Sequence, residues 1–380
     1  MRRAALLCAA VALGSGTIVP ALPAATELVA PSALNGVSCP TSTRCFAVGV
    51  SFATPSSHTR SLVERWNGSS WSVMPSANGG ATSTWLAAVA CTSATSCMAV
   101  GNTTSSGSGG PAYAERLVGN NWSTVAIPAA GTNALLSDIA CTGPKNCFAV
   151  GEYTRSGVSQ PLALLWNGQK WSIVPAALPA GLLGGELRGV GCASAATCFA
   201  VGGTDDFHGG NVAIVERWTG TKWVIERQFT TPGGVTPELV DVSCPTTTHC
   251  RAVGNDGSAN VRTLTAAWNG STWSLEASAN RKFMPENYLL GVSCWTASDC
   301  FAVGESRESH SGPTHTLTER RSGTRWSSIA SPNKNPEYTT LDGVDCIGPN
   351  RCFAVGTSDA ASAVVILQWN GTRWTNVTPP

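Results

Sequence analysis

The chain is poor in charged residues and in most of the patterns that catalytic sites use. Lys, Arg, Asp and Glu make up only 12% of its 380 residues, the formal net charge is +1, and there are five histidines. The sequence shows no basic patch, which argues against a nucleic-acid partner. It also lacks a Gly-x-Ser-x-Gly elbow, a P-loop and a dinucleotide-binding fingerprint. We therefore expect no cofactor and assign no catalytic residue.

Long apolar runs and amphipathic helical patterns are equally scarce. The exception is the amino end, where Met1-Arg2-Arg3 precedes a small and apolar stretch over 4–19 and a small-residue segment over 21–25. This order is typical of a secretory signal peptide, so we predict a signal peptide over residues 1–25 and an extracellular, secreted protein. The alternative is that the same segment is retained as a membrane anchor. No other run is long and apolar enough to span a bilayer.

What the sequence has in abundance is one repeated unit. Fourteen of its fifteen cysteines form seven pairs with five residues between the members, and successive pairs begin 50 to 52 residues apart. A constant period near 50 residues is the signature of a propeller or an array of repeats. The pairs are Cys39 with Cys45, Cys91 with Cys97, Cys141 with Cys147, Cys192 with Cys198, Cys244 with Cys250, Cys294 with Cys300, and Cys346 with Cys352.

An even number of cysteines behind an export signal indicates disulfide bonds in an oxidising compartment. We predict seven disulfides, each within its own repeat. Zinc binding is the competing interpretation of close cysteine pairs. Zinc sites, however, need two pairs to converge, and here each pair lies in a separate repeat, so we expect no metal.

Each repeat reads as four short strands. The first is expected to begin at a leucine that recurs in every copy, and its residues are small or apolar on both faces, as in a strand packed on both sides. The second is a Phe-Ala-Val-Gly run, in which Met98 and Arg251 replace the phenylalanine in two copies. The recurring leucines are Leu34, Leu86, Leu136, Leu187, Leu239, Leu289 and Leu341.

The third and fourth strands form a hairpin of the type Trp66-Asn67-Gly68-Ser69-Ser70-Trp71. Asn-Gly supplies the positive φ angles that such turns need. The second and sixth copies lose the first tryptophan. Twelve of the fourteen tryptophans belong to these hairpins, and we interpret them as packing residues of the repeats rather than as platforms for sugars.

These two motifs resemble known families of propellers. The Trp-Asn-Gly-x-x-Trp-Ser turn resembles the Asp-box hairpin of sialidase-type propellers, with Asn-Gly in place of Asp-x-Gly. The combination of Phe-Ala-Val-Gly with a later Gly-x-x-Trp hairpin resembles the photosystem II assembly-factor propellers. The resemblance covers all seven repeats and implies a propeller fold. It carries no catalytic residue, because the arginine triad and the Tyr/Glu pair of sialidases have no match in this sequence.

The predicted fold class is all-β. We expect residues 26–380 to form one seven-bladed β-propeller of four-stranded antiparallel blades, with one disulfide within each blade. The repeats start near residues 34, 86, 136, 187, 239, 289 and 341. Residues 26–31 resemble the end of a repeat and are expected to add a strand beside the last blade.

Because neighbouring strands alternate in direction, the disulfide loops and the Asn-Gly hairpins should share one face of the propeller. The other face should hold the connections that vary in length and composition, and binding residues tend to lie on such loops. When the seven repeats are aligned, each position forms a column of seven residues. The columns on either side of the recurring leucine, which should lie at the channel mouth on that face, contain aromatic residues and acids. The candidate ligand-binding residues are Trp85, Glu186, Arg188, Glu238, Tyr288 and Asp342, with Asp138 and Asp241 as further acids of the mouth.

Two classes of function follow. The first is a secreted, non-enzymatic and monomeric propeller that binds a glycan or an extracellular protein through its variable face. The alternative is a secreted hydrolase or lyase that acts on a polysaccharide with acids at the channel mouth. An enzyme should bring a proton donor, a base and a charge-stabilising group within reach of each other. The distances among Glu186, Arg188, Glu238 and Asp241 should discriminate between the two.

Overall fold

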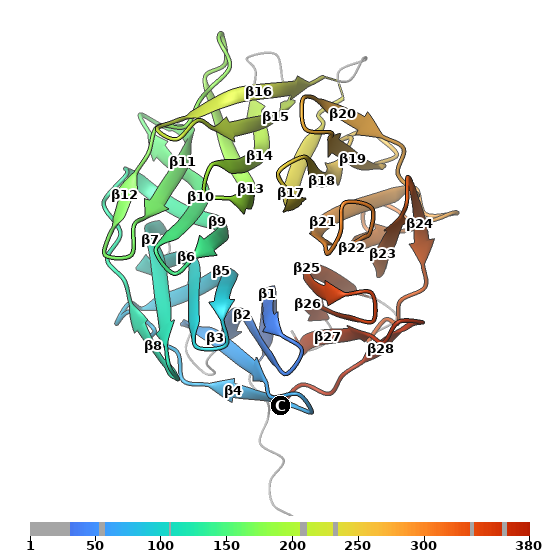
Figure 1. Ribbon diagram of the computed structural model, residues 1–380, viewed down its shortest axis with the longest axis horizontal. Helices are drawn as coiled ribbons and strands as arrows, with labels where there is room; N and C mark the ends of the chain where they lie inside the picture. The colour runs from blue at the N-terminus through green and yellow to red at the C-terminus, as the bar shows by residue number, and fades with distance from the viewer. Residues whose placement is uncertain are drawn as a thin grey trace, which may run out of the picture.

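The strands form seven four-stranded antiparallel sheets around a central axis, in a computed structural model (Figure 1). The structure describes residues 31–52, 58–105, 108–205, 211–230, 235–334, 338–358 and 363–380. The predicted seven-bladed β-propeller is confirmed. The predicted signal peptide and most of the strand expected at 26–31 lie outside the described residues. Blade 7 is complete without that strand, because it contains four strands of its own.

Each blade is one contiguous segment of the chain, and its strands follow one another from the channel outwards. Blade 1 contains β1 (Ser32–Thr41), β2 (Arg44–Phe52), β3 (Thr59–Trp66) and β4 (Trp71–Met74); blade 2 contains β5 (Ser83–Ser93), β6 (Ser96–Ser105), β7 (Ser108–Val118) and β8 (Asn121–Thr124). Blade 3 contains β9 (Thr132–Gly143), β10 (Asn146–Arg155), β11 (Val158–Trp166) and β12 (Trp171–Ile173); blade 4 contains β13 (Gly184–Ser194), β14 (Thr197–Asp205), β15 (Asn211–Trp218) and β16 (Trp223–Phe229). Blade 5 contains β17 (Glu238–Thr246), β18 (His249–Asn255), β19 (Thr263–Trp268) and β20 (Trp273–Glu276); blade 6 contains β21 (Glu286–Cys294), β22 (Cys300–Arg307), β23 (Thr314–Ser322) and β24 (Arg325–Ile329). Blade 7 contains β25 (Thr339–Gly348), β26 (Arg351–Ser358), β27 (Ala363–Trp369) and β28 (Trp374–Asn376).

The inner strands begin earlier than the sequence predicts. Every recurring leucine is buried, but β1 begins two residues before Leu34 and β9 begins four residues before Leu136. The reason is pairing with the second strand, whose end continues the ladder beyond the leucine, as in the Ser32 and Ser51 pair. Each inner strand therefore extends further towards the variable face, which is called the loop face below.

All seven predicted disulfides are confirmed, each within its own blade and with a Cα–Cα distance of 4.0 to 4.1 Å. Each joins the end of a first strand to the start of the second strand beside it. The bonded pairs are Cys39 with Cys45, Cys91 with Cys97, Cys141 with Cys147, Cys192 with Cys198, Cys244 with Cys250, Cys294 with Cys300, and Cys346 with Cys352.

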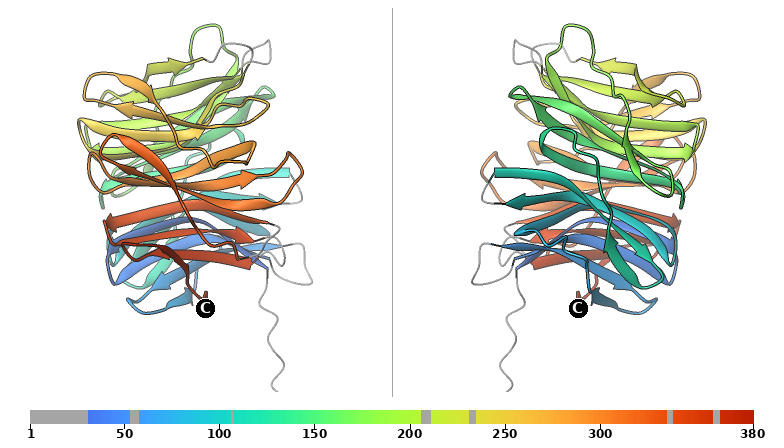
Figure 2. Two further views of the ribbon diagram at one scale, coloured as in Figure 1. Left: turned by 90° about the vertical axis from the view of Figure 1, so that its right-hand side faces the viewer. Right: turned by 90° about the vertical axis from the view of Figure 1, so that its left-hand side faces the viewer.

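The disulfide loops lie at the end of the ring that also holds the tight hairpins between third and fourth strands. A Cβ built on Gly68 would lie 3.3 Å from Thr43 in the neighbouring disulfide loop, so the two turns are in contact. This end is called the turn face below. Figure 2 shows the two opposite ends with the blades seen edge-on.

Most neighbouring blades pack through an aromatic contact. The phenylalanine of a second strand packs on the tryptophan pair of the next blade, as Phe148 does on Trp218 and Trp223 at centroid distances of 4.8 and 5.1 Å. The same contact closes the ring, because Phe353 of blade 7 lies 5.1 Å from Trp66 and 5.3 Å from Trp71 of blade 1. All twelve hairpin tryptophans are buried, which confirms their interpretation as packing residues.

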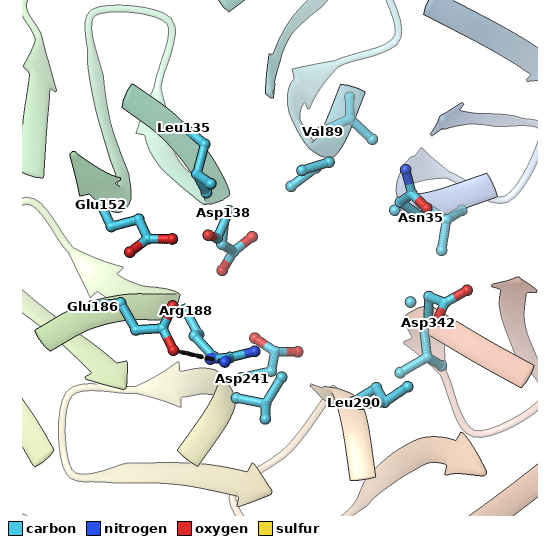
Figure 3. Close-up of a pocket in the computed structure, with 18 residues that line it drawn as sticks. Asn35, Val89, Leu135, Asp138, Glu152, Glu186, Arg188, Asp241, Leu290 and Asp342 are labelled. Atoms are coloured by element: carbon cyan, nitrogen blue, oxygen red, sulfur yellow. Dashed lines mark hydrogen bonds and ion pairs between the residues drawn. The ribbon is translucent and has the colours of Figure 1, made fainter. Parts of the chain in front are cut away.

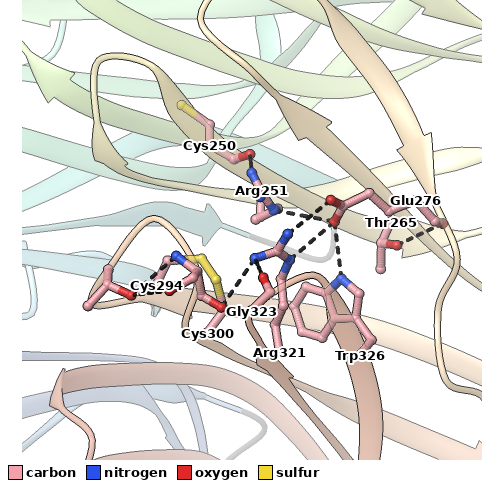
Figure 4. A network of polar contacts seen from close by, with 11 residues as sticks. Cys250, Arg251, Thr265, Glu276, Cys294, Cys300, Arg321, Gly323 and Trp326 are labelled. Carbon is pink, nitrogen blue, oxygen red and sulfur yellow. Dashed lines mark hydrogen bonds and ion pairs between the residues drawn. A yellow bond between two sulfur atoms is a disulfide. The ribbon is translucent and has the colours of Figure 1, made fainter.

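One seam, between blades 5 and 6, replaces this aromatic contact with buried charges (Figure 4). Arg251 takes the place of the phenylalanine and Arg321 that of the first tryptophan, and both are at most 5% exposed. Glu276 lies between them, 3.3 Å from Arg251 Nε and 3.1 Å from Arg321 Nη2. The indole of Trp326 also donates to Glu276, over 3.4 Å. Two guanidinium groups thus share one carboxylate at this seam.

Hydrogen bonds between inner strands support the ring at other seams. Ser38 accepts the Cys91 amide of the next blade over 3.1 Å, and Ser243 and Ser293 make equivalent bonds. In blade 7 the same position holds Asp345, which accepts the Cys39 amide over 2.6 Å. Blade 7 is thus joined to blade 1 by side chains, and no strand of one is inserted into the sheet of the other among the described residues.

Buried glutamates on third strands form a further contact between blades. Glu115, Glu216 and Glu319 are fully buried, and burial raises the pKa of Glu216 to about 8. Each accepts a backbone amide from the connection that follows the preceding blade; the donors are Ala77, Ala177 and Ala279. These carboxylates stabilise packing and are remote from the channel. Within the described residues, the structure contains no helix long and apolar enough to cross a membrane.

Candidate functional site

The inner strands place a ring of bulged residues at the channel mouth on the loop face. In every blade the ladder between first and second strands shifts by one residue directly after the recurring leucine. Such a bulge bends the strand and redirects the side chain of the extra residue. The extra residues are Asn35, Ala87, Ser137, Arg188, Val240, Leu290 and Asp342, and all seven line one cavity of about 510 Å³ (Figure 3).

A local steric reason keeps this bulge in all seven blades. Opposite it stands the glycine of the Phe-Ala-Val-Gly run. A Cβ on Gly202 would lie 2.0 Å from the carbonyl oxygen of Glu186, and a Cβ on Gly254 would lie 2.0 Å from that of Glu238. Only glycine allows such an approach of the two backbones. The repeated glycine therefore fixes the positions from which the mouth residues project.

Arg188 is held between two carboxylates of the mouth. Its Nη2 lies 2.6 Å from Glu186 Oε1, and its Nε forms an ion pair with Glu238 of the next blade. Burial raises the pKa of Glu186, while the guanidinium opposes that shift. The fold thus brings together three predicted residues from two blades. They form an ion triad in which both carboxylates are already committed to the arginine.

Asp138 and Asp241 line the same cavity but serve the ring itself. Asp138 accepts the backbone amide of Val190 in the next blade over 2.7 Å. Asp241 accepts that of Val292 over 2.7 Å and that of Val242 over 2.7 Å. Burial raises the pKa of both carboxyl groups, that of Asp241 to about 6. These two acids of the mouth therefore join neighbouring blades.

Asp342 lies across the channel from Arg188 (Figure 3). Its hydrogen bond from the Thr340 hydroxyl is a long one of 3.5 Å. Burial and the nearby Glu305 carboxylate raise the pKa of Asp342 from 3.8 to about 7. Asp342 and Glu152 are the carboxylates of this cavity for which the described part of the chain shows neither an ion pair with an arginine nor a hydrogen bond from a backbone amide.

This shift predicts a pH dependence of stability. A carboxyl group whose pKa is raised by folding contributes stability below about pH 4, and that contribution is lost as the pH rises through about 7. Asp342→Asn does not titrate, so it should become progressively more stable relative to the parent protein between these pH values. Urea unfolding at both ends of the range measures the difference. Ser328→Ala, at an exposed position that carries no titratable group, is the control and should show no such trend.

One carboxylate of the cavity is not among the residues predicted from the sequence. Glu152 comes from the second strand β10, directly after the Phe-Ala-Val-Gly run, and it accepts a hydrogen bond from the Ser159 hydroxyl. It stands close enough to Glu186 to raise the pKa of that group further. The sequence signal for Glu152 is its position directly after the recurring glycine. A residue at that position pairs with the residue before the recurring leucine, as Glu152 does with Leu135, and so lies beside the channel mouth.

Trp85 lies in a separate groove between blades 1 and 2, with a volume of about 400 Å³. It is 51% exposed, and Phe52 on the same groove is 39% exposed. The remaining lining is uncharged and mostly polar, including Asn102, Thr104 and Asn35. Asn35 also lines the central cavity, so the groove and the channel mouth adjoin.

Tyr288 lies at a third place on the loop face, outside the lining of both cavities. Its ring stacks under the Arg307 guanidinium at 5.3 Å, and its hydroxyl donates to Glu286 over 3.3 Å. Burial and the Glu286 carboxylate raise the pKa of Tyr288. The predicted candidates therefore fall into three groups, with Glu186, Arg188, Glu238 and Asp342 at the mouth, Trp85 in its groove and Tyr288 in blade 6. No group of three or more potential metal ligands occurs among the described residues.

No protein-family model and no protein of curated function matches this sequence. Solved structures are similar in fold. A structure of YCF48 bound to a D1 peptide is 12% identical with a TM-score of 0.55, and the match covers 90% of this chain and 94% of that chain. The GH74 xyloglucanase from Xanthomonas campestris is 11% identical with a TM-score of 0.60, covering 91% of this chain and 54% of that one.

A third similar structure is Sqt1 from Chaetomium thermophilum bound to the N-terminus of the ribosomal protein L10. It is 12% identical with a TM-score of 0.51, and the match covers 90% of this chain and 85% of that chain. Identities this low show the fold alone. The predicted resemblance to photosystem II assembly-factor propellers is thus confirmed at the level of the fold.

Proposed function

We propose that this protein is a secreted, non-catalytic binding propeller whose loop face takes a glycan, with a segment of an extracellular protein as the other ligand that this face fits. The observation that carries the proposal is Trp85. Twelve of the fourteen tryptophans are buried, and Trp295 is partly buried, so Trp85 is the one tryptophan with a half-exposed indole. An exposed aromatic side chain in a groove is the usual anchor of a ligand.

The chemistry of the groove favours a sugar ring. A sugar offers an apolar face of C–H groups and a rim of hydroxyl groups. Trp85 and Phe52 supply apolar surface, while the amides of Asn35 and Asn102 and the hydroxyl of Thr104 can donate and accept hydrogen bonds. A lining made of uncharged residues suits a neutral ligand. Similar folds that bind a peptide, YCF48 and Sqt1, support the protein alternative.

Trp85→Ala tests this proposal. Loss of the indole face should weaken binding to the best ligand of a glycan array by about tenfold or more, whereas Trp85→Phe should retain part of the affinity. Phe283→Ala is the matched control, because Phe283 is 97% exposed on the same face but lies outside the groove. If both variants lose the same affinity, or if Trp85→Ala loses none, the groove is not the binding site for the glycan. Binding only to proteins in a parallel capture from culture medium would select the protein alternative.

Polysaccharide hydrolysis or lysis is the second candidate, and Asp342 favours it. A carboxyl group with a pKa near 7 can act as a general acid at neutral pH. No free base stands beside it in the described part of the chain, since Glu186 and Glu238 are paired with Arg188, Asp241 accepts two backbone amides, and Glu152 accepts the Ser159 hydroxyl. A reducing-sugar assay on the polysaccharide that binds should show no turnover. Turnover that Asp342→Asn abolishes would establish the enzyme and overturn the non-catalytic proposal.

A further inference from the structure

The turn face of the ring carries an excess of positive charge. Its fourteen turns, all of them within the described residues, hold seven lysines and arginines, and Asp299 is the one acid among them. The Asp299 carboxylate is itself occupied by the hydroxyls of Thr296 and Ser298, at 2.8 and 2.9 Å. The seven basic residues are Arg44, Lys145, Lys170, Lys222, Arg325, Arg351 and Arg373.

Four of these residues lie on three consecutive blades, and we call them the arginine arc: Arg325 in blade 6, Arg351 and Arg373 in blade 7, and Arg44 in blade 1. Arg351 donates to the Ser42 carbonyl in the disulfide loop that contains Arg44, over 2.6 Å. The hairpin of Arg373 touches the loop of Arg351, since a Cβ on Gly371 would lie 2.6 Å from Asn350. The fold thus joins residues that are far apart in the sequence, which is why no basic patch is visible there.

Two arginines that line the loop face are in a different state. Arg188 and Arg307 are neutralised by Glu186, Glu238 and Glu305. Among the described residues, none of the four arginines of the arc forms an ion pair with a carboxylate. The exposed aromatic side chains of the described residues lie outside the turns of this face; they are Phe52, Trp85, Phe283 and Tyr338. The tryptophan that does lie in one of these turns, Trp295, is half-buried and packs on Phe301 at 5.9 Å. The arc therefore offers charge and hydrogen-bond donors without a stacking surface.

We propose that the arginine arc binds a linear polymer of phosphate groups. The planar guanidinium presents N–H donors in pairs that match two oxygens of one phosphate. Four such groups across three blades fit a chain with one charge on each short repeat unit, and a single small anion would use only one or two of them. Binding displaces the counterions condensed along the polymer, which supplies the driving force. This surface lies at the end of the ring opposite to the Trp85 groove, so it is independent of the proposed function.

Long-chain inorganic polyphosphate is the probe, with affinity measured by titration calorimetry over a series of salt concentrations. Four contacts should give a slope of log K against log salt of about −3, from roughly −0.7 for each contact in a flexible polyanion. Arg325→Gln/Arg373→Gln should halve this slope and weaken binding by about tenfold or more at low salt. Arg155→Gln/Arg262→Gln removes the same charge from exposed positions of the loop face and should leave both values unchanged.

Three results would overturn the proposal. The first is equal weakening by the two double variants, which would indicate general attraction by net charge. The second is binding of inorganic triphosphate as tightly as the long chain, which would indicate a small-anion site. The third is a clear preference for single-stranded DNA over polyphosphate at equal phosphate concentration, since a preference for bases needs stacking that the arc lacks. Melting curves of both double variants should match the parent protein, and glycan binding should be unchanged in both.

Discussion

Trp71→Ala is expected to lower the free energy of unfolding by about 3–5 kcal/mol, the usual cost of truncating a large buried aromatic side chain. Trp71 is 4% exposed and packs in the cluster that joins blade 7 to blade 1. Its ring lies 5.3 Å from Phe353 and 5.8 Å from Trp66. Truncation leaves a cavity beside both rings at the seam where the two ends of the ring meet. Urea unfolding followed by tryptophan fluorescence measures the loss.

Trp85→Ala is the matched comparison, because it removes the same side chain from a half-exposed position. A surface substitution away from special features changes stability by no more than about 0.5 kcal/mol. The pair therefore separates a packing tryptophan from a binding tryptophan in one experiment. If Trp85→Ala unfolds as early as Trp71→Ala, Trp85 is part of the core and the glycan proposal loses its anchor.

Glu276→Gln is expected to destabilise the protein by about 3 kcal/mol or more. Removing the one carboxylate leaves two guanidinium groups at the blade 5 and blade 6 seam without a counter-charge, and an uncompensated buried charge is costly. Arg251 and Arg321 are 5% and 3% exposed, so water can replace the carboxylate only in part. Burial already lowers the pKa of Arg251. The loss should appear in urea unfolding at neutral pH.

Restoring the aromatic contact is the control for this prediction. Glu276 pairs with Thr265 at the position where blade 1 pairs Met74 with Val63, so the corresponding change is Arg251→Phe/Glu276→Met/Arg321→Trp. Replacing a buried charge cluster by well-packed apolar residues is often neutral or stabilising. The triple variant should therefore be at least as stable as the parent protein. A triple variant as unstable as Glu276→Gln would show that the seam needs the charges for another reason.

The fold was predictable because each recurring residue of the repeat has one structural role. The recurring leucine is buried, the phenylalanine packs on the next blade, and the glycine stands where a Cβ would meet a carbonyl oxygen. The disulfides, such as Cys39 with Cys45, and the hairpins follow from spacing alone. The bulge after the leucine escaped notice, since an extra residue in one strand leaves no mark on a period counted along the chain.

The candidate site was predictable only in part. The columns placed Glu186, Arg188 and Glu238 near one mouth, but a column says nothing about what a carboxylate contacts. Asp138 and Asp241 therefore counted as ligand-facing acids, although each accepts a backbone amide from the next blade. Tyr288 shared a column with Trp85, yet an arginine one strand away covers its ring. Such contacts depend on neighbouring strands and blades, which a single column does not contain.

Among the described residues the ring closes without an exchanged strand, and this bears on the origin of such a chain. Five of the seven repeats offer a phenylalanine that packs on the hairpin tryptophans of the next repeat, so the last seam is of the same kind as most internal ones. The first and last described strands both lie at a blade boundary, and the unit that duplicates in a gene is then the same unit that packs in the protein. Insertion or loss of one copy leaves every sheet intact. A change in copy number then has to be accommodated by the contacts between blades, among them the hydrogen bond from the Cys39 amide to Asp345 at the closing seam.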